Sequence, residues 1–314
     1  MPSYSAFWSK ISSSQNLKTR IAFTDPTDPR VAAAAGELAE KKLIVPHLVG
    51  AAASSDRPRF KELLSEKQKR LHLSSSDLES QLDDPLFHGI CLLLEKRVDG
   101  LVGGSLRPTA DIVRAALQIV GPKAGGRLVS GHFLIETEAG PTKDATPFLF
   151  ADCAVVPEPS PRFLAATAAG AAASYRFFTG GTPRVAFLSF STRGSAQHPL
   201  VDRIKEALEI TRKQDANLLV DGEIQLDAAL DPEVAVIKKA SDSAVAGRAN
   251  VLVFPTLEAG NIGYKLVQRF AKARIAGPLL WGLDRPMSDL SRGCNVQEII
   301  DTALCVSLMA QGVN

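Results

Sequence analysis

The chain has 314 residues, of which 45% are hydrophobic and 22% are charged, and its formal net charge is +2 at pH 7. This length suits two domains of ordinary size, and this composition excludes a disordered or fibrous protein. Because acidic and basic residues nearly balance, no net field would attract a polyanion such as DNA, and nucleic-acid binding is not expected.

Short apolar runs alternate with helical patterns along the first part of the chain. We expect strands over 20–23 and 43–49 with a helix over 31–41 between them, and a strand over 99–102 followed by a helix over 109–120. This alternation predicts βαβ units and a mostly parallel sheet.

A segment rich in Gly, Lys and Pro, residues 121–144, interrupts the alternation around an expected strand over 128–135, and we place the domain junction there. Beyond it the alternation resumes, which predicts a second α/β sheet. The last helix, expected over 296–311, follows a turn-rich loop over 284–294 and is expected to pack back on the first domain. The other expected elements are an alanine-rich helix over 165–173, strands over 184–188, 218–220 and 251–254, and helices over 199–213 and 260–273.

The expected fold class is therefore α/β, with two doubly wound α/β domains. Domain I is discontinuous and covers residues 1–128 plus about 280–314. Domain II covers residues 129–279, and each boundary is set to within about ten residues.

The cysteines and the hydropathy pattern bear on the compartment. Four cysteines, Cys91, Cys153, Cys294 and Cys305, lie far apart and form neither a CxxC pair nor a disulfide framework. The first residues lack the apolar run of a secretory signal, and no stretch approaches the roughly 18 apolar residues of a membrane span. We therefore expect a cytoplasmic protein without a membrane partner.

Several common catalytic motifs are absent from the sequence. There is neither G-x-x-x-x-G-K-[ST] nor G-x-G-x-x-G, which disfavours ATP and NAD as ligands. There is no G-x-S-x-G elbow and no H-E-x-x-H, and the five histidines are scattered. Neither a hydrolase triad nor a metal site is expected.

Polar segments stand at four places where an α/β sheet would pass from strand to helix, which is where such sheets bind ligands. Residues 189–195 (SFSTRGS) offer hydroxyls, amides and a cation that suit a phosphate, or they cap a helix start and bind no ligand. Residues 221–227 (DGEIQLD) place three acids after a strand. These acids suit general-base chemistry or the bracing of a domain interface, and we slightly favour bracing.

The other two polar segments carry cations. Residues 260–265 (GNIGYK) open an expected helix whose N-terminus suits an anionic ligand, and Lys265 shares a helical face with Arg269. Residues 288–294 (SDLSRGC) combine two hydroxyls, a carboxylate and a guanidinium in a turn, and an arginine fork suits a phosphate.

Taken together and in order, these segments resemble the phosphate acetyltransferase family, which also includes phosphate butyryltransferases. The resemblance covers nearly all of the chain from residue 150, and the first half is weaker, carried by VDGLVGG (98–104), TAD (109–111) and Arg114. The matching text in the second half is FAD (150–152), LSFSTRGSA (188–196), DGEIQLDAA (221–229), SAVAGRAN (243–250), NVLVFP (250–255), GNIGYKLVQR (260–269) and SDLSRGC (288–294).

The resemblance implies an active site in a cleft between two α/β domains, and a homodimer. It also implies a ternary complex without a covalent enzyme intermediate: a carboxylate accepts the thiol proton of coenzyme A, and the thiolate attacks an acyl phosphate. Coenzyme A is then a substrate, together with phosphate, acetyl-CoA and acetyl phosphate, and no tightly bound cofactor is implied.

The resemblance also assigns site residues. It implies Ser291, Arg292 and Glu298 as catalytic residues, with Glu298 as the base, and it implies that Cys294 lies near the site without acting as a nucleophile. The residues implied for binding coenzyme A or acyl phosphate are Arg269, Arg114, Thr109, Asn261, Tyr264, Lys265, Asp289, Ser191 and Thr192.

This chain departs from the family pattern at three places. Glu298 stands where an aspartate is usual, Gln68 where an arginine is often found, and Arg107-Pro108 where a histidine and a serine are often found. These departures leave open a scaffold homologue that binds coenzyme A but has lost catalysis. A propionyl or butyryl transferase is a further alternative, because the sequence does not fix the volume of the acyl pocket. The retained Ser291 and Arg292 favour an active enzyme.

Overall fold

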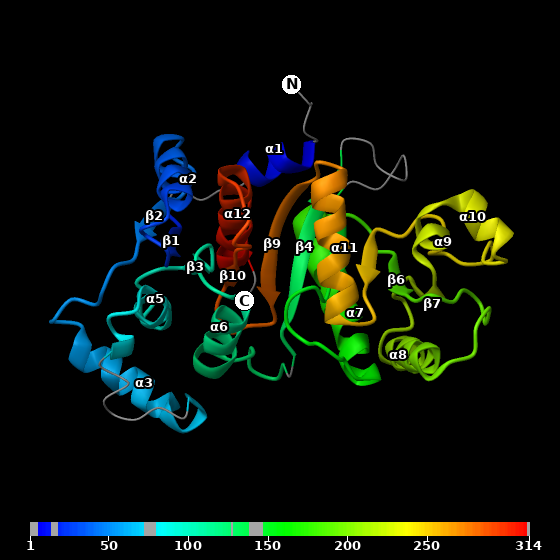
Figure 1. Cartoon of the computed structure of the whole chain (residues 1–314), viewed down its shortest axis with the longest axis horizontal. Coiled ribbons are helices and arrows are strands. Elements are labelled where there is room, and N and C mark those ends of the chain that lie inside the picture. Colours follow the sequence, from blue (N-terminus) through cyan, green and yellow to red (C-terminus); the bar gives the residue numbers. More distant parts are fainter. Residues whose placement is uncertain (1–5, 14–17, 72–79, 127, 138–146, 313–314) are drawn as a thin grey trace. The chain divides into compact units, whose positions relative to one another are not determined.

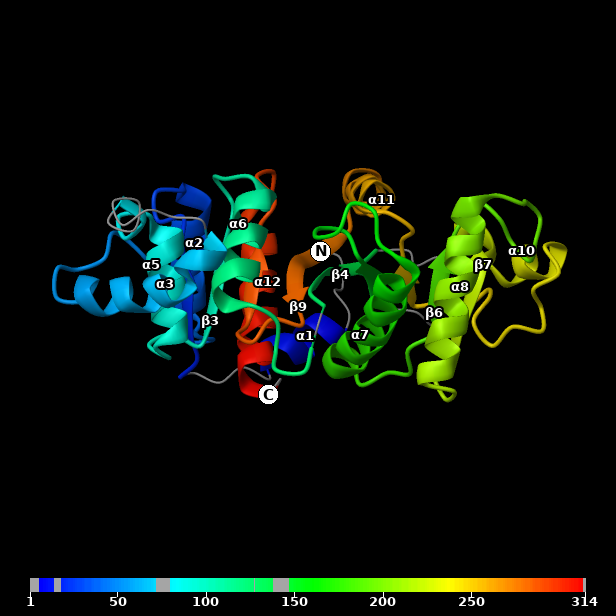
Figure 2. The same cartoon turned by 90° about the horizontal axis from the view of Figure 1, so that it is seen from below.

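The computed structural model describes residues 6–13, 18–71, 80–126, 128–137 and 147–312, without the side chains of residues 6 and 66–71. The chain forms two compact units, which are described separately (Figures 1 and 2). Unit 1 holds residues 1–9 and 130–275, and unit 2 holds residues 10–129 and 276–314. Helix α1 (Ala6–Ser13) and strand β9 (Arg274–Trp281) run across the boundaries between these residue sets.

The sheet of unit 2 has four parallel strands in the order β2-β1-β3-β10, and β9 pairs antiparallel with β10 through Leu279 and Ser288. Its central strands are apolar and buried on both faces, as parallel strands covered by helices must be. The bounds of the strands are β1 (Arg20–Phe23), β2 (Val45–Leu48), β3 (Gly100–Gly103) and β10 (Met287–Asp289).

Two helices of unit 2, α2 and α5, start at an aspartate that caps them. Asp28 and Asp84 accept a backbone N–H at the starts of α2 and α5, and a proline follows each at the first helical position. Helix α12 packs on α2 and β3 (Figure 1), where Gly100 leaves room for Val306. The bounds are α2 (Pro29–Glu40), α3 (Arg57–Leu71), α5 (Pro85–Leu94), α6 (Thr109–Ala115), the π-helical turn η1 (Ala116–Val120) and α12 (Val296–Gly312).

The sheet of unit 1 has the order β4-β5-β8-β6-β7, with β4 antiparallel to β5 and the remaining pairs parallel. Helices α7 and α8 lie side by side (Figure 2), and the buried alanines of α7 allow close packing. The bounds are β4 (Ser130–Glu136), β5 (Phe148–Ala151), β6 (Val185–Leu188), β7 (Val220–Ile224), β8 (Val251–Val253), α7 (Pro161–Thr179), α8 (Pro199–Gln214), α9 (Leu226–Leu230), α10 (Pro232–Ile237) and α11 (Leu257–Phe270).

The α/β class is confirmed, and some expected element bounds are wrong. The helix expected over 260–273 begins at Leu257, because Thr256 accepts the N–H of Ala259 and caps it there. The loop expected over 284–294 contains β10, which is completed by pairing with β3 and carries no local strand signal of its own. No helix within the described ranges is long and apolar enough to cross a membrane.

Candidate active site

Three loops meet at the carboxyl edge of the sheet in unit 2, because β1, β3 and β10 are parallel. The carboxylate of Asp25, after β1, accepts the N–H groups of Gly104 and Ser105, after β3, at 2.7 and 3.2 Å. Gly104 has a φ of +103°, and a Cβ there would lie 1.9 Å from Oδ1 of Asp289. Only glycine therefore fits where the loops after β3 and β10 touch.

Asp289, at the end of β10, is closed off from solvent. It is 1% exposed, and its Oδ2 accepts the hydroxyl of Thr109 at 2.6 Å. Burial raises the pKa of Asp289 to about 7; the charge of Asp25 raises it further, and Thr109 and Arg292 oppose the shift. Thr109 and Asp289, both expected to bind substrate, bind each other here, and this contact holds the start of α6 against β10.

The turn after β10 presents Ser291 and Arg292. The Arg292 side chain is exposed, and among the described residues its guanidinium makes no hydrogen bond. The hydroxyl of the half-buried Ser291 accepts the N–H of Gly293 at 3.3 Å, so its own proton can be donated elsewhere. An arginine fork beside a hydroxyl is a suitable receptor for a phosphate or an acyl phosphate.

Glu298 and Asn295 cap the start of α12 together. The N–H of Glu298 donates to Oδ1 of Asn295 at 2.9 Å, and Nδ2 of Asn295 donates to Oε1 of Glu298 at 3.0 Å. This reciprocal pair resembles a capping box. The carboxylate implied as the base thus has a structural role as well, and it is half-buried in the first turn of α12, next to the loop that carries Arg292.

Cys294 lies in this loop as a buried thiol. Burial raises its pKa to about 12, and Glu298 and Asp28 raise it further against the opposing charge of Arg30. A thiol with such a pKa stays protonated near neutral pH and is a poor nucleophile.

Two other arginines of unit 2, Arg107 and Arg114, each pair with an aspartate. Both terminal nitrogens of Arg107 bind the Asp84 carboxylate, at 3.0 and 2.8 Å, which ties the family departure at this position to the cap of α5. Arg114 is exposed and pairs with Asp111 at 3.1 Å on the surface of α6. The side chain of Gln68 lies outside the described residues.

In unit 1 the loop after β6 binds itself and β7. The N–H groups of residues 191–196 all donate within the protein, to neighbouring loop atoms or to Glu223. The hydroxyl of Ser191 donates to Oε1 of Glu223 at 2.9 Å, and Thr192 exchanges hydrogen bonds with Gln225. Because each of these N–H groups is bonded within the protein, none is free to bind a phosphate in this arrangement. The same hydrogen bonds hold the loop in place.

Two of the acids expected after a strand, Asp221 and Glu223, lie within β7 and act as braces. Asp221, which is buried, binds Arg193 and Arg212 at 3.1 Å each. The buried Glu223 accepts the N–H of Gly194 at 2.7 Å. These acids therefore brace the loop after the neighbouring strand β6, whereas we had expected them to brace a domain interface.

Helix α11 carries the remaining expected binding residues. Lys265 and Arg269 are exposed on one face, and Asn261 is half-buried. Tyr264 is buried, with its ring stacked on Phe133 at 4.0 Å between centroids. Because α11 starts at Leu257, residues 260–265 lie inside the helix and do not form its N-terminus. The prediction that the helix N-terminus at these residues would attract an anion is therefore wrong.

Three residues at the carboxyl edge of unit 2 were missed from the sequence: Asp25, Asp28 and Arg30. A signal for them exists, since the polar run TDPTDPR (24–30) directly follows β1. The rule that selected the segments after other strands applies to it equally.

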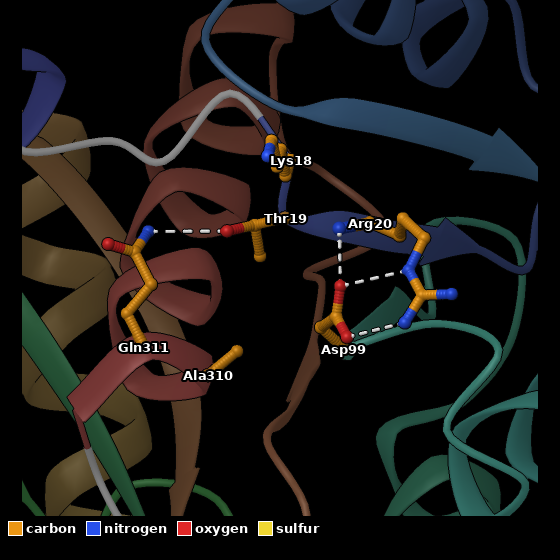
Figure 3. A pocket seen from close by; sticks show the side chains of 6 residues that line it. All are labelled: Lys18, Thr19, Arg20, Asp99, Ala310 and Gln311. Carbon is orange, nitrogen blue, oxygen red and sulfur yellow. Dashed lines mark hydrogen bonds and ion pairs between the residues drawn. The ribbon is translucent and has the colours of Figure 1, made fainter.

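At the other end of β1, unit 2 has a hollow of about 400 Å³ (Figure 3). Arg20 there binds both oxygens of Asp99, at 3.1 and 2.8 Å, and donates to the carbonyl of Lys96 at 2.8 Å. The other lining residues are Lys18, Thr19, Ala310 and Gln311. This hollow lies at the amino edge of the strands, away from the Ser291–Arg292 turn.

Comparison with known proteins gives a consistent result. A family model described as phosphate acetyl/butaryl transferase matches residues 7–307. A phosphate acetyltransferase of Thermoanaerobacterium thermosaccharolyticum is 45% identical over 246 residues, covering 78% of this chain and 75% of the relative. One of Paracoccus denitrificans is 39% identical over 307 residues, covering 94% and 96%. The crystal structure of a phosphotransacetylase from Streptococcus pyogenes has a TM-score of 0.83 at 34% identity and covers 98% of both chains.

Proposed function

This chain belongs to the phosphate acetyl/butaryl transferase family, and we propose that it transfers acetyl groups reversibly between coenzyme A and inorganic phosphate. Acetyl-CoA and phosphate give acetyl phosphate and coenzyme A, and the reverse reaction returns them. The observation that carries this proposal is the exposed Arg292 fork beside the Ser291 hydroxyl, on a turn fixed at the carboxyl edge of a parallel sheet.

The proposed reaction is a direct attack within a ternary complex. Glu298 accepts the thiol proton of coenzyme A, and the thiolate attacks the carbonyl carbon of acetyl phosphate. The resulting tetrahedral intermediate breaks its bond to the phosphate oxygen and releases inorganic phosphate and acetyl-CoA. Arg292 binds the phosphate oxygens, and Ser291 donates to the developing negative charge.

Exposed cations and polar groups supply the proposed binding site for coenzyme A. Arg114, Lys265 and Arg269 are exposed and suit its phosphates. In this proposal Asn261 and Tyr264 support the substrate on α11, while Thr109, Asp289, Ser191 and Thr192 hold the surrounding loops. No metal ion takes part, because arginine forks meet the phosphate charge. The four cysteines are free, which suits a reducing cytoplasm.

The test is thioester formation from coenzyme A and a series of acyl phosphates, followed by absorbance. We expect the highest kcat/KM with acetyl phosphate, and full activity after treatment with a chelator. A higher kcat/KM with butyryl phosphate would identify a butyryltransferase instead. Thioester formation with none of the acyl phosphates, from protein that still binds coenzyme A, would favour the scaffold alternative.

A further inference from the structure

Arg30 lies at the second position of α2, beside the loops of the candidate active site. Asp28 caps this helix, and its carboxylate accepts the N–H of Arg30 at 2.9 Å. The same carboxylate binds the guanidinium in two places, Nε at 3.1 Å and Nη2 at 2.7 Å. The Asp28–Arg30 pair therefore has the geometry of a bidentate fork, which holds the guanidinium plane in one orientation.

The remaining N–H groups of Arg30 bind backbone carbonyls of the two neighbouring loops. Nη2 donates to the carbonyl of Ser105, after β3, at 3.1 Å. Nη1 donates to the carbonyls of Arg292 and Cys294, after β10, at 2.9 and 2.7 Å. A guanidinium has five N–H groups, and here each has an acceptor.

Asp28 makes this clamp permanent over the physiological pH range. Its side chain is 2% exposed, and the hydrogen bond from Arg30 is the largest cause that lowers its pKa, to about 2. Both members of the pair are thus charged at neutral pH. Because Asp28 neutralises it, Arg30 acts on the loops through hydrogen-bond geometry more than through net charge.

The two carbonyls that Nη1 binds flank Gly293 in the turn that presents Ser291 and Arg292. Within that turn the N–H of Cys294 donates to the carbonyl of Ser291 at 2.9 Å. Since the bound carbonyl of Arg292 belongs to the residue whose side chain is exposed, fixing that carbonyl fixes the direction in which the Arg292 side chain leaves the backbone.

We propose that Arg30 is a positioning residue for the acyl transfer, which holds the Ser291–Arg292 turn in its productive geometry through the carbonyls of Arg292 and Cys294. This inference rests on the proposed function. Arg30 itself touches no substrate in this proposal, and it acts through Arg292.

Arg30→Lys tests the clamp, because lysine keeps the charge but has three donors on one nitrogen and cannot bind Asp28 and three carbonyls at once. A small displacement of a catalytic group can cost about 100-fold in rate, so we expect kcat to fall by about 10–100-fold. The KM for coenzyme A should change little. Far-UV circular dichroism and the unfolding midpoint establish that the assayed variant is folded.

Arg20→Lys is the matched control. Arg20 makes the same kind of contact at the other end of β1. It binds both oxygens of Asp99 (Figure 3), and it donates to the backbone carbonyl of Lys96. Its substitution should lower stability but leave kcat within about twofold of the parent, because the amino edge of the sheet carries no part of the proposed reaction. An equal loss of kcat in both variants would overturn the proposal.

A double-mutant cycle with Arg292→Lys separates positioning from a general structural role. If Arg30 acts through Arg292, Arg30→Lys should cost less than about threefold when Arg292 is already lysine. The same loss in both backgrounds would overturn the proposal. If Arg30→Lys does not fold, Asp28→Asn, which keeps a good helix cap but loses the charged fork, should show the same non-additivity.

The outcomes for the parent enzyme separate this inference from the proposed function. A parent that forms no thioester would overturn the proposed function and the role of Arg30 together. An active parent, with Arg30→Lys at the parental kcat, would overturn the role of Arg30 alone.

Discussion

Glu298 occupies the third position of α12, where its carboxylate serves two purposes at once. It accepts a hydrogen bond from Asn295 at 3.0 Å as part of a reciprocal cap, and it is the base of the proposed reaction. The usual test of a base, replacement by alanine, would remove both. Glutamine keeps the cap, because it replaces glutamate in capping boxes.

Glu298→Gln should therefore lower kcat with little change in the unfolding midpoint. A positioned base contributes about 10²–10⁴-fold, which sets the expected loss, while the affinity for coenzyme A should be kept. Steady-state kinetics and thermal unfolding of the same preparation measure both. Parental turnover in this variant would place the base elsewhere, and parental turnover in Glu298→Asp would mean that the departure from the family pattern is neutral.

Asp289 gives the chain a pH-dependent stability. Burial raises its pKa to about 7, above the value of about 3.9 expected in the unfolded chain. Between these values the folded protein holds a proton that the unfolded chain has lost. The free energy of unfolding from this group therefore falls as pH rises from about 4 to 7, by up to about 1.4 kcal/mol per pH unit.

Asp289→Asn removes this titration while keeping an acceptor for Thr109. We expect the difference in unfolding free energy, variant minus parent, to rise between pH 5 and 7 and to level off above that. Urea titrations of both proteins at a series of pH values measure this difference. A difference that does not depend on pH would mean that Asp289 is ionised throughout, with Asp25 nearby and Arg292 as its counter-charge.

At the scale of elements, two carboxylates hold Arg193 of the loop after β6: Asp221 from β7 and Asp242 from the segment after α10. Asp221 and Asp242 approach Nη2 of Arg193 at 3.1 and 3.0 Å, but Asp221 is 5% exposed and Asp242 is 75% exposed. Asp221 also binds Arg212 and the N–H of Gly222. The two ion pairs are nearly equal in distance and differ in burial.

Asp221→Ala should destabilise the protein by about 1–3 kcal/mol, because it removes a buried carboxylate that accepts hydrogen bonds from Arg193, Arg212 and the N–H of Gly222. Asp242→Ala is the matched control and should cost less than about 1 kcal/mol, as exposed pairs do. The urea midpoints of the two variants provide the comparison. Equal shifts would show that the ion pair with Arg193, and not burial, determines the effect.

The elements also show how far the sequence predicts this fold. Strand β1 and helices α8 and α12 are expected within one or two residues of their bounds, because apolar periodicity and capping residues are local signals. Strand β10 was expected as a loop, since its three residues become a strand only by pairing with β3. The register of β10 depends on residues almost 190 positions earlier in the chain, since Ser288 pairs with Val102.

The candidate site was predicted in the same uneven way. The Ser291–Arg292 turn follows from motif and resemblance. The polar run over 24–30 marks the loop that holds Arg30, but its hydrogen bonds to the backbone carbonyls of Arg292 and Cys294 leave no pattern in residue type. The sequence could not show that the amides after β6 are already bonded within the protein. Four of those amides bond to atoms of their own loop, and the other two bond to Glu223 of β7.

At the scale of the whole molecule, helix α11 exposes a row of large apolar side chains to solvent. Ile262, Leu266 and Phe270 are 52, 50 and 84% exposed, and their spacing of four places them on one face of the helix. Large exposed apolar groups in a row are typical of protein interfaces. We propose that this row packs against a second copy of the chain, which is the homodimer that the resemblance implies.

Leu266→Asp should therefore shift the protein from dimer to monomer in light scattering after size exclusion, since a buried carboxylate opposes its symmetry-related copy in an isologous interface. Leu226→Asp is the control, because Leu226 is 48% exposed but lies on α9, outside this row. The control should remain a dimer. A parent that is monomeric at micromolar concentration would contradict the proposal, and a dimer that persists in Leu266→Asp would move the interface to another face of the chain.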